Sequence, residues 1–368
     1  METYDKLRLL ARDSQYDLAC SCGTNDQDRR RRSAEGTWLY PVPLAAGGTG
    51  IMFKTLLSNA CTSDCAYCPL RHTGNAQRCS LMPEEVATAF IEHLRRQKLV
   101  GIFLSSGITG NADQTMERLV AAGELLRRKH GYRGYIHLKV IPGASEAAID
   151  AALRVASAVS LNIEVPGRKH FEKLSHYKHF DADIVRPLKY IAAQTATGMR
   201  YAKLRTTTQF IVGASDESDR EIVTYLDGIY TRLNFDRAYF SAYQEQVGER
   251  RAGEGAPADR LMREHRLYQA DFLLRQYRFD AAELVFDDQG NFSLACDPKE
   301  MWAQRHPEFF PVRIQTADRE ALLRVPGLGP VSVARILALR RNERITSLAH
   351  AGIRGATCSK ATGYCSFA

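Results

Sequence analysis

The feature that most constrains the fold is a regular alternation of short apolar segments with longer amphipathic ones between about residues 50 and 280. The apolar, β-branched segments predict strands at residues 51–57, 100–104, 135–141, 159–163, 206–212 and 238–241. The amphipathic segments predict helices at residues 83–97, 114–130, 145–155, 184–195, 219–233 and 259–277. Six such units in series predict an α/β fold with a parallel sheet, either doubly wound or a partial barrel. In both forms the chemistry belongs at the C-terminal ends of the strands.

The chain has 368 residues, of which 45% are hydrophobic, so it suits one large domain and a smaller one. We expect an N-terminal extension over residues 1–49, a barrel domain over 50–300 and a small all-α module over 312–368. The sequence contains no run of about 18 apolar residues, and its first residues lack the apolar core of a signal peptide. These observations predict a cytoplasmic protein with no membrane partner.

Three of the nine cysteines fall within eight residues, immediately after the first predicted strand. Cys61, Cys65 and Cys68 have a spacing that lets one loop wrap an iron–sulfur cluster. Three thiolates leave one iron of a [4Fe–4S] cluster without a protein ligand, which is the open position that catalysis needs. A structural zinc site is the alternative, with Cys79 as a fourth ligand. Cys20 and Cys22 leave a second metal site open.

This C-x3-C-x2-C segment, with Tyr67 just before its last cysteine, resembles the signature of radical S-adenosylmethionine (SAM) enzymes. The resemblance covers roughly residues 50 to 250. It implies a partial (β/α)6 TIM-like barrel whose cluster binds SAM and cleaves it reductively to methionine and a 5′-deoxyadenosyl radical. It also implies an external reductant such as a flavodoxin or ferredoxin, and a place for Tyr67 near the cofactor.

Two further segments support the resemblance and supply cofactor-binding candidates. Ser105, Ser106 and Gly107 stand where the family usually carries a Gly-Gly-Glu-like turn, and since the acid is missing, hydroxyl and carbonyl groups would meet the SAM amino group. Asn162 and Glu164 alternate on one strand, as in the ribose-binding strand of biotin-synthase-like members. A strand-end hydrogen-bonded pair is the alternative for these two residues.

The fifth predicted strand ends in a weaker match to the adenine-binding region of the family. Val212 and Gly213 would meet adenine there, and Glu217 retains the acid of that region. Lys139 and Tyr243 are predicted to face the same cavity, although Lys139 serves equally well as an internal ion-pair partner.

The C-terminal sixth of the chain is basic. Residues 312–368 contain nine Lys or Arg and three Asp or Glu, an excess of six positive charges out of a formal +8 for the whole chain. A compact basic module predicts a polyanionic partner, and a merely solvated basic face is the alternative.

Within this module, a Gly-Leu-Gly turn precedes a predicted helix over residues 331–341. Two glycines around one apolar residue allow a tight turn whose amides lie near a helix N-terminus, where a phosphate oxygen binds readily. The segment resembles the helix–hairpin–helix motif, which binds nucleic-acid backbones, and a hairpin used only for packing is the alternative. The resemblance implies that nucleic acid is bound by Gly327, Leu328, Gly329, Arg335, Arg340 and Arg341.

The whole layout resembles a narrower radical SAM family assigned to nucleic-acid modification or repair and linked to uracil-DNA glycosylases. The resemblance rests on residues 16–18, 54–61, 103–108 and 160–164 and on the terminal hairpin. It implies modification or repair of DNA, or of structured RNA, with a uracil-DNA glycosylase-like protein as a partner. The rivals are a nucleic-acid-binding protein with a structural metal cluster, and a radical SAM enzyme acting on a small molecule or protein.

Overall fold

The computed structural model describes residues 1–14, 38–44, 47–244 and 257–367, and the chain divides into two compact units. The first, which we call the barrel unit, consists of Met1–Glu217 and Gly228–Glu264. The second, the C-terminal unit, consists of Ser218–Asp227 and His265–Ala368. Cys20, Cys22 and residues 16–18 lie outside the described residues.

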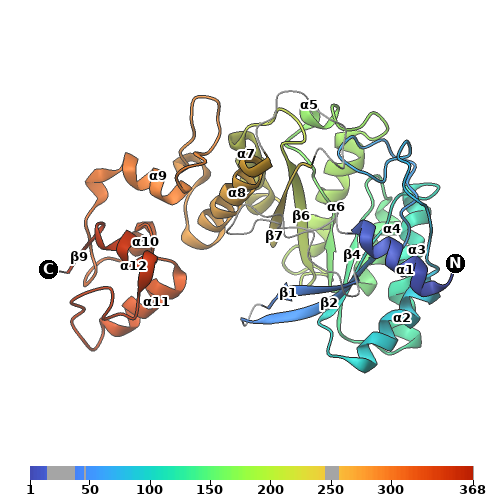
Figure 1. The fold of residues 1–368 in the computed structure, drawn as a ribbon, viewed down its shortest axis with the longest axis horizontal. Coiled ribbons are helices and arrows are strands. Elements are labelled where there is room, and N and C mark those ends of the chain that lie inside the picture. Colours follow the sequence, from blue (N-terminus) through green and yellow to red (C-terminus); the bar gives the residue numbers. More distant parts are fainter. Residues whose placement is uncertain (15–37, 45–46, 245–256, 368) are drawn as a thin grey trace. The chain divides into compact units, whose positions relative to one another are not determined.

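The barrel unit is built on a sheet whose strands follow one another in chain order (Figure 1). The strands are β1 (Leu39–Pro43), β2 (Thr49–Leu56), β3 (Gly101–Ser105), β4 (Tyr135–Lys139), β5 (Ala158–Ser160), β6 (Arg205–Val212) and β7 (Arg237–Ala242). Strands β2 to β7 are parallel neighbours. A doubly wound sheet reverses its strand order at a switch point, whereas this order never reverses. The partial-barrel prediction is therefore confirmed, as are all six predicted strands.

The N-terminal extension adds a helix and an edge strand to this sheet. Strand β1 pairs antiparallel with β2, and its two prolines, Pro41 and Pro43, are tolerated because an edge strand leaves one row of N–H groups unused. Helix α1 (Thr3–Asp13) buries Leu7 and Leu10 completely. Helix α1 ends at Asp13, and this residue also lines the cavity of the candidate site.

Helices lie between the parallel strands, as predicted, and one more follows β7. They are α2 (Pro83–Arg96), α3 (Ala112–Glu124), α4 (Glu146–Val155), α5 (Arg168–Phe171), α6 (Arg186–Thr195), α7 (Asp219–Thr231) and α8 (Pro257–Tyr277). Their starts follow capping chemistry: Pro83 occupies the first turn of α2, and the Asn111 side chain accepts the backbone N–H of Gln114 in α3. Single π-helical turns at Leu125–Lys129 and Phe180–Val185 extend α3 and lead into α6.

The C-terminal unit contains α9 (Pro298–Arg305), β8 (Val312–Arg313), α10 (Arg319–Arg324), α11 (Pro330–Leu339), α12 (Gly355–Thr362) and β9 (Cys365–Ser366). Its core includes Leu322, Leu328, Ile336 and Ile345. Strand β9 pairs parallel with β8. The module therefore contains a two-stranded sheet, whereas the sequence led us to expect helices alone. This pairing also gives the tail after Gly355, for which the sequence suggested no structure, a defined place.

In the part of the chain that the structure describes, no helix is both long and apolar enough to cross a membrane.

Candidate functional site

The three clustered cysteines lie on the loop that follows β2, and all three line one cavity of the barrel unit. Cys65 is buried, while Cys61 and Cys68 are half-buried, and none is in a disulfide. Side chains from the ends of β3, β4, β6 and β7 line the same cavity. The site therefore lies where a parallel barrel places its chemistry, at the C-terminal ends of the strands.

Hydrogen bonds from distant residues hold this loop in place. The guanidinium of Arg78 donates to the backbone oxygens of Asn59, Leu70, Arg71 and Gly74. One side chain therefore clamps both ends of the cysteine segment. Such a web fixes a segment that has no regular structure of its own.

Two carboxylates extend the web. The Asn59 amide donates to Asp13 Oδ2 at 2.6 Å, so the end of α1 forms part of the cavity wall. Asp64 accepts the Ser175 hydroxyl and the backbone N–H of His176. Partial burial opposes ionisation of Asp64, but these hydrogen bonds outweigh it and leave the pKa of that carboxyl below its ordinary value.

Hydrogen-bond donors lie close to two of the three thiols. Lys178 Nζ lies 3.0 Å from Cys65 Sγ, and the backbone N–H groups of Ser63 and Ile108 each lie 3.4 Å from Cys61 Sγ. Burial, aided by the charge of Cys65, raises the pKa of Cys68 to about 12. Cys68 therefore resists ionisation on its own, and a bound metal cluster would supply the positive charge that its thiolate needs. The donor set fits an iron–sulfur cluster.

A structural zinc ion fits less well. Zinc requires its thiolates to converge at about 2.3 Å from one point, yet the described residues contain no group of three or more His, Cys, Asp or Glu placed to hold one ion. Cys79, the proposed fourth ligand, is not among the described residues that line the cavity. Its thiol contacts the backbone oxygen of Lys6 at 3.8 Å instead. A four-iron cluster binds each thiolate through a different iron, so it needs no such convergence.

Ser105, Ser106 and Gly107 line the cavity at the end of β3, as predicted. The Ser106 hydroxyl donates to the backbone oxygen of Gly107 at 2.7 Å. A Cβ at Gly107 would lie 2.3 Å from the backbone oxygen of Ala60, so only glycine lets this turn approach the cysteine loop.

Asn162 and Glu164 also line the cavity, just beyond β5, and are joined by a hydrogen bond of 3.3 Å. Tyr67 donates its hydroxyl to Glu164 at 2.7 Å, which links the cysteine loop to this strand end. Glu164 has a φ of 66°, in the left-handed region, although its side chain is buried. Burial raises its pKa. A strained, buried carboxyl that faces a cavity is typical of a functional site.

The structure places Val212 and Gly213 elsewhere. Neither is among the described residues that line the cavity, where β6 contributes Gln209 and Ile211. Gly213 instead begins a tight turn, with a φ of 79°, and donates its backbone N–H to Glu217 at 2.6 Å. The position of Val212 and Gly213 therefore does not support the prediction that they meet SAM.

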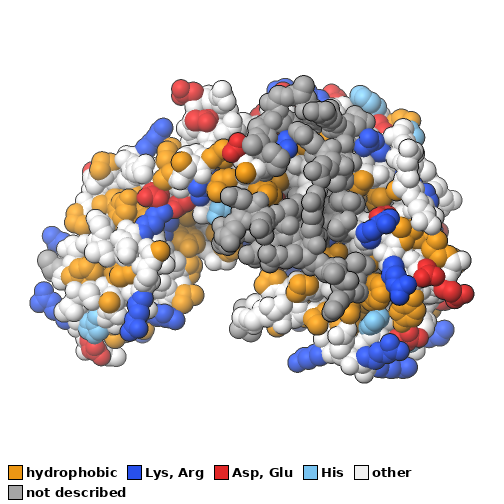
Figure 2. Space-filling model, viewed as in Figure 1, with side chains coloured by type: hydrophobic (Ala, Val, Ile, Leu, Met, Phe, Trp, Pro, Cys, Tyr) orange, Lys and Arg blue, Asp and Glu red, His pale blue; other side chains and the backbone are white. Residues whose placement is uncertain are grey.

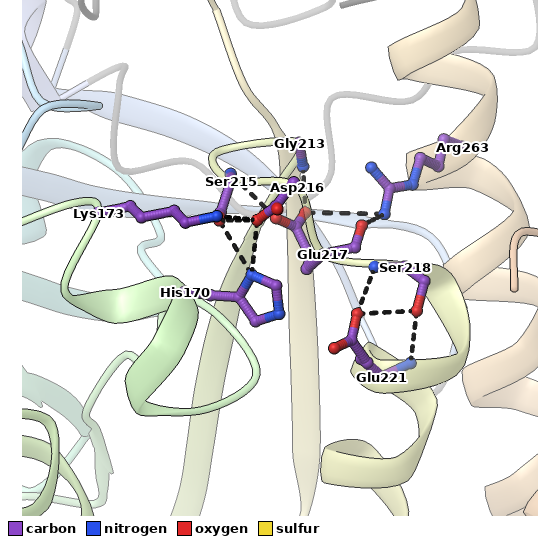
Figure 3. Close-up of polar contacts among 9 residues, drawn as sticks. All are labelled: His170, Lys173, Gly213, Ser215, Asp216, Glu217, Ser218, Glu221 and Arg263. Atoms are coloured by element: carbon purple, nitrogen blue, oxygen red, sulfur yellow. Dashed lines mark hydrogen bonds and ion pairs between the residues drawn. The ribbon is translucent and has the colours of Figure 1, made fainter. Parts of the chain in front are cut away.

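The turn after β6 carries the polar network shown in Figure 3. Buried Glu217 accepts the N–H groups of Gly213 and Ser215, and Arg263 donates to its backbone oxygen. Asp216 accepts Lys173 Nζ at 2.6 Å, and this contact holds the pKa of Asp216 well below its ordinary value. The Glu217 carboxylate accepts hydrogen bonds from the backbone of its own turn. We therefore assign Glu217 a structural role in this turn.

Other residues of the cavity were only partly foreseen. Lys139 and Tyr243 line it, as predicted. Lys178, Gln209 and Asp13 also line it, and the sequence analysis did not identify them. Lys178 and Asp13 carry no local signal, because they join the site through contacts with residues far away in the sequence. Gln209 lies on β6, where every side chain from residue 206 to 212 is buried and no alternation marks the cavity side.

The C-terminal unit forms the predicted helical hairpin. Helices α10 and α11 flank a turn in which Gly327 has a φ of 87°, Leu328 is buried and Gly329 is the N-cap of α11. A Cβ at Gly327 would lie 2.6 Å from the backbone oxygen of Thr357 in α12. The glycine is therefore needed for both its backbone conformation and its close packing.

A second turn of the same kind follows 25 residues later and was not predicted. Gly352 has a φ of 72°, Ile353 is buried and Arg354 is the N-cap of α12, which matches Gly327, Leu328 and Gly329 in order. The correspondence continues to Arg335 and Lys360. The second turn lacks the Gly-x-Gly spacing, and that is why the sequence pattern did not reveal it.

The three predicted arginines have different surroundings. Arg335 and Arg341 are exposed. Arg340 instead donates to the backbone oxygens of Ile314 at 3.0 Å and Ala317 at 2.6 Å. Figure 2 shows Lys and Arg side chains along the margin of this unit, with few acids between them. Arg340 therefore stabilises the fold, while Arg335 and Arg341 are available to a partner.

Comparisons with known proteins give only partial likenesses. No family profile and no curated protein sequence matches the chain. The [FeFe]-hydrogenase maturase HydG from Carboxydothermus hydrogenoformans superposes with a TM-score of 0.49 at 13% identity, over 61% of this chain and 51% of that one. Methylornithine synthase (PylB) superposes with a TM-score of 0.47 at 15% identity, over 59% and 61%. The chain thus spans about half to three fifths of these structures, and what its cavity binds must be inferred from its own residues.

Proposed function

We propose that the protein is a radical SAM enzyme that modifies or repairs nucleic acid, DNA in preference to RNA. The observation that carries the first part is the convergence of Cys61, Cys65 and Cys68 on one cavity at the C-terminal ends of a parallel partial barrel. Their spacing resembles the radical SAM signature, and the strand ends around them supply polar side chains suited to a nucleoside.

The three cysteines would hold a [4Fe–4S] cluster, which when bound supplies the electron that cleaves SAM to methionine and a 5′-deoxyadenosyl radical. Asn162 and Glu164 would bind the ribose hydroxyls, since both line the cavity and are already oriented by their mutual hydrogen bond. Tyr67 fixes Glu164 through its hydroxyl. Glu164 has a strained, left-handed backbone conformation, and this conformation would orient its carboxylate toward the ribose.

The C-terminal unit supports the nucleic-acid part of the proposal. Two matching turns, each ahead of a helix N-terminus, offer backbone amides to phosphate oxygens. Exposed Arg335, Arg341 and Arg354 add positive charge around them. Such contacts position a backbone without reading its sequence, so a base would have to be unstacked before the barrel cavity could act on it.

The test of the radical chemistry is anaerobic reconstitution with iron and sulfide, reduction in the presence of SAM, and chromatography for 5′-deoxyadenosine. We expect 5′-deoxyadenosine from the wild type and none from Cys65→Ala. If the reduced wild type, with its cluster intact, forms none even with DNA or RNA present, the proposal is wrong. The rival of a nucleic-acid-binding protein with a structural cluster would then stand.

The substrate class is tested separately. We expect DNA or RNA to stimulate 5′-deoxyadenosine formation, and we expect this stimulation to fall steeply with added salt, because phosphate contacts release counterions. Stimulation by small molecules or proteins alone, with no dependence on salt, would instead support a radical SAM enzyme whose hairpin unit serves assembly.

A further inference from the structure

The C-terminal unit contains a cavity beside the first hairpin turn, and the proposed function does not use its lysine or its aromatic side chains. It has a volume of about 450 Å³ and is lined by residues of α8, α9, α11 and α12 and by the turn itself. Among them are the aromatic side chains of Phe272 and Tyr277, the hydroxyls of Ser332 and Thr357, and Lys299. We propose that this cavity binds the phosphomonoester of a nucleotide, with Lys299 on the phosphate and the aromatic wall against the nucleoside.

Lys299 is the residue that points to an anion. Its side chain is 8% exposed, and its ammonium donates to the backbone oxygen of Leu328 at 2.5 Å. That oxygen is the one acceptor it contacts among the described residues, although an ammonium group has three N–H donors. Two donors thus remain on an ammonium group that is itself largely buried and that lies over the Tyr277 ring.

The charges around Lys299 are not neutralised by a free carboxylate. Asp297 also lines the cavity, but Lys360 Nζ lies 2.5 Å from it. Arg324, whose charge also acts on Lys299, is paired with Glu283. Burial lowers the pKa of Lys299 to about 7, with Asp297 opposing this shift and Lys360 and Arg324 adding to it. Lys360 is shared with Glu300, whose Oε2 also lies 2.5 Å from its Nζ. Among the described residues, no carboxylate contacts the Lys299 ammonium itself.

The aromatic wall distinguishes a nucleotide from a bare phosphate ion. Phe272 lines the cavity and is 39% exposed, and the Arg275 guanidinium lies 5.4 Å from its ring centre. Tyr277 lies under the Lys299 ammonium, 4.7 Å from nitrogen to ring centre, and its hydroxyl has no hydrogen-bond partner among the described residues. Bases stack on such rings without regard to sequence, and this stacking is worth roughly 1–3 kcal/mol per base.

A monoester suits this cavity better than an internal phosphodiester. A strand end can enter a cavity, whereas an internal phosphate has chain on both sides, and the monoester carries up to two negative charges near neutral pH. The same chemistry is present in a free mononucleotide and at a phosphorylated strand end. The inference that the ligand is a strand end rests on the proposal that this unit binds nucleic acid.

The test uses the full-length protein and an internally labelled single-stranded oligonucleotide in three forms, with a 5′-phosphate, a 3′-phosphate or hydroxyls at both ends. Fluorescence anisotropy should show one phosphorylated form binding about tenfold more tightly than the hydroxyl form, the scale of one charge-assisted contact. Lys299→Met should abolish this preference. Arg335→Ala, the matched control, should weaken all three forms equally and leave the ratio unchanged.

A second experiment separates a free mononucleotide from a phosphorylated strand end as the ligand. It uses adenosine 5′-monophosphate, both as a competitor of the oligonucleotides and alone in calorimetry. Binding of the mononucleotide without binding of any oligonucleotide would support the cavity and contradict the proposed nucleic-acid function. Equal affinity for the three oligonucleotides, with no binding of the mononucleotide, would overturn the inference while leaving nucleic-acid binding intact. The wild-type comparison is decisive even if Lys299→Met fails to fold.

Discussion

The ammonium nitrogen of Lys178 lies 3.0 Å from the sulfur of Cys65, across 113 residues of sequence. Both groups line the barrel cavity, and the thiol would carry negative charge when it ligates iron. The lysine is thus a positive charge and a hydrogen-bond donor placed directly on a ligand sulfur. Hydrogen bonds to ligand sulfurs are one of the means by which proteins set cluster potentials.

We therefore expect Lys178→Met to lower the reduction potential of the reconstituted cluster, on the order of tens of millivolts, because the reduced, more negative state loses this donor. A redox titration followed by electron paramagnetic resonance measures the change. Lys173→Met is the matched control, since Lys173 pairs with Asp216. Equal potentials in the wild type and Lys178→Met would contradict this role.

Cys65→Ala and Cys79→Ala should differ sharply in cluster content. Cys65 lines the cavity, whereas the Cys79 thiol contacts the backbone of Lys6. Iron and acid-labile sulfide, measured after anaerobic reconstitution, should fall severalfold in Cys65→Ala and remain at the wild-type level in Cys79→Ala. Loss of iron in both variants would revive Cys79 as a ligand.

Gly327→Ala should destabilise the C-terminal unit more than Gly352→Ala. Both positions have a positive φ, which costs an alanine about 1–2 kcal/mol. Only at Gly327 would the new methyl group also collide with a backbone oxygen, that of Thr357, because nothing lies within 4 Å of the corresponding point at Gly352. Urea denaturation followed by Trp302 fluorescence measures both changes in the free energy of unfolding, and equal losses would show that the packing of α12 contributes nothing.

Arg335→Ala and Arg340→Ala should separate binding from stability. Arg335 is exposed, so its loss should weaken binding of every oligonucleotide and reduce the slope of log affinity against log salt by about 1. Arg340 holds two backbone carbonyls, so its loss should lower the free energy of unfolding by about 1–3 kcal/mol. A salt slope unchanged by Arg335→Ala would remove that residue from the phosphate-binding surface.

Lys299 should make a contribution to the stability of the C-terminal unit that rises with pH above neutrality, and Cys365, whose pKa burial raises to about 12, should oppose it above about pH 9. Burial lowers the pKa of Lys299 to about 7, from 10.5 when unfolded. Between these values the unfolded chain binds more protons, so the free energy of unfolding should increase as pH rises, by at least about 1 kcal/mol. The increase should disappear in Lys299→Met, as measured by urea denaturation at pH 7 and pH 10. An identical rise in this variant would assign the effect to other groups.

The sequence predicted the strands, the cysteine loop and the first hairpin because these depend on local patterns. In β6 the side chains of residues 206–212 are all buried, so no alternation in the sequence shows that Ile211 rather than Val212 lines the cavity. Lys178 lies in an irregular connection and joins the site only through a distant contact. Likewise, Arg340 donates hydrogen bonds to backbone carbonyls more than 20 residues away in the sequence. Local sequence patterns do not predict contacts over such a separation.

The anchoring of the cysteine loop also sets an order of events during synthesis. Cys61, Cys65 and Cys68 leave the ribosome more than 100 residues ahead of three groups that hold their loop, the backbone oxygen of Leu174, the Ser175 hydroxyl and the Lys178 ammonium. Until those residues emerge, the nascent chain presents three reactive thiols on an unsupported segment. Insertion of the proposed cluster into a fully supported loop would therefore have to wait until Lys178 has been synthesised.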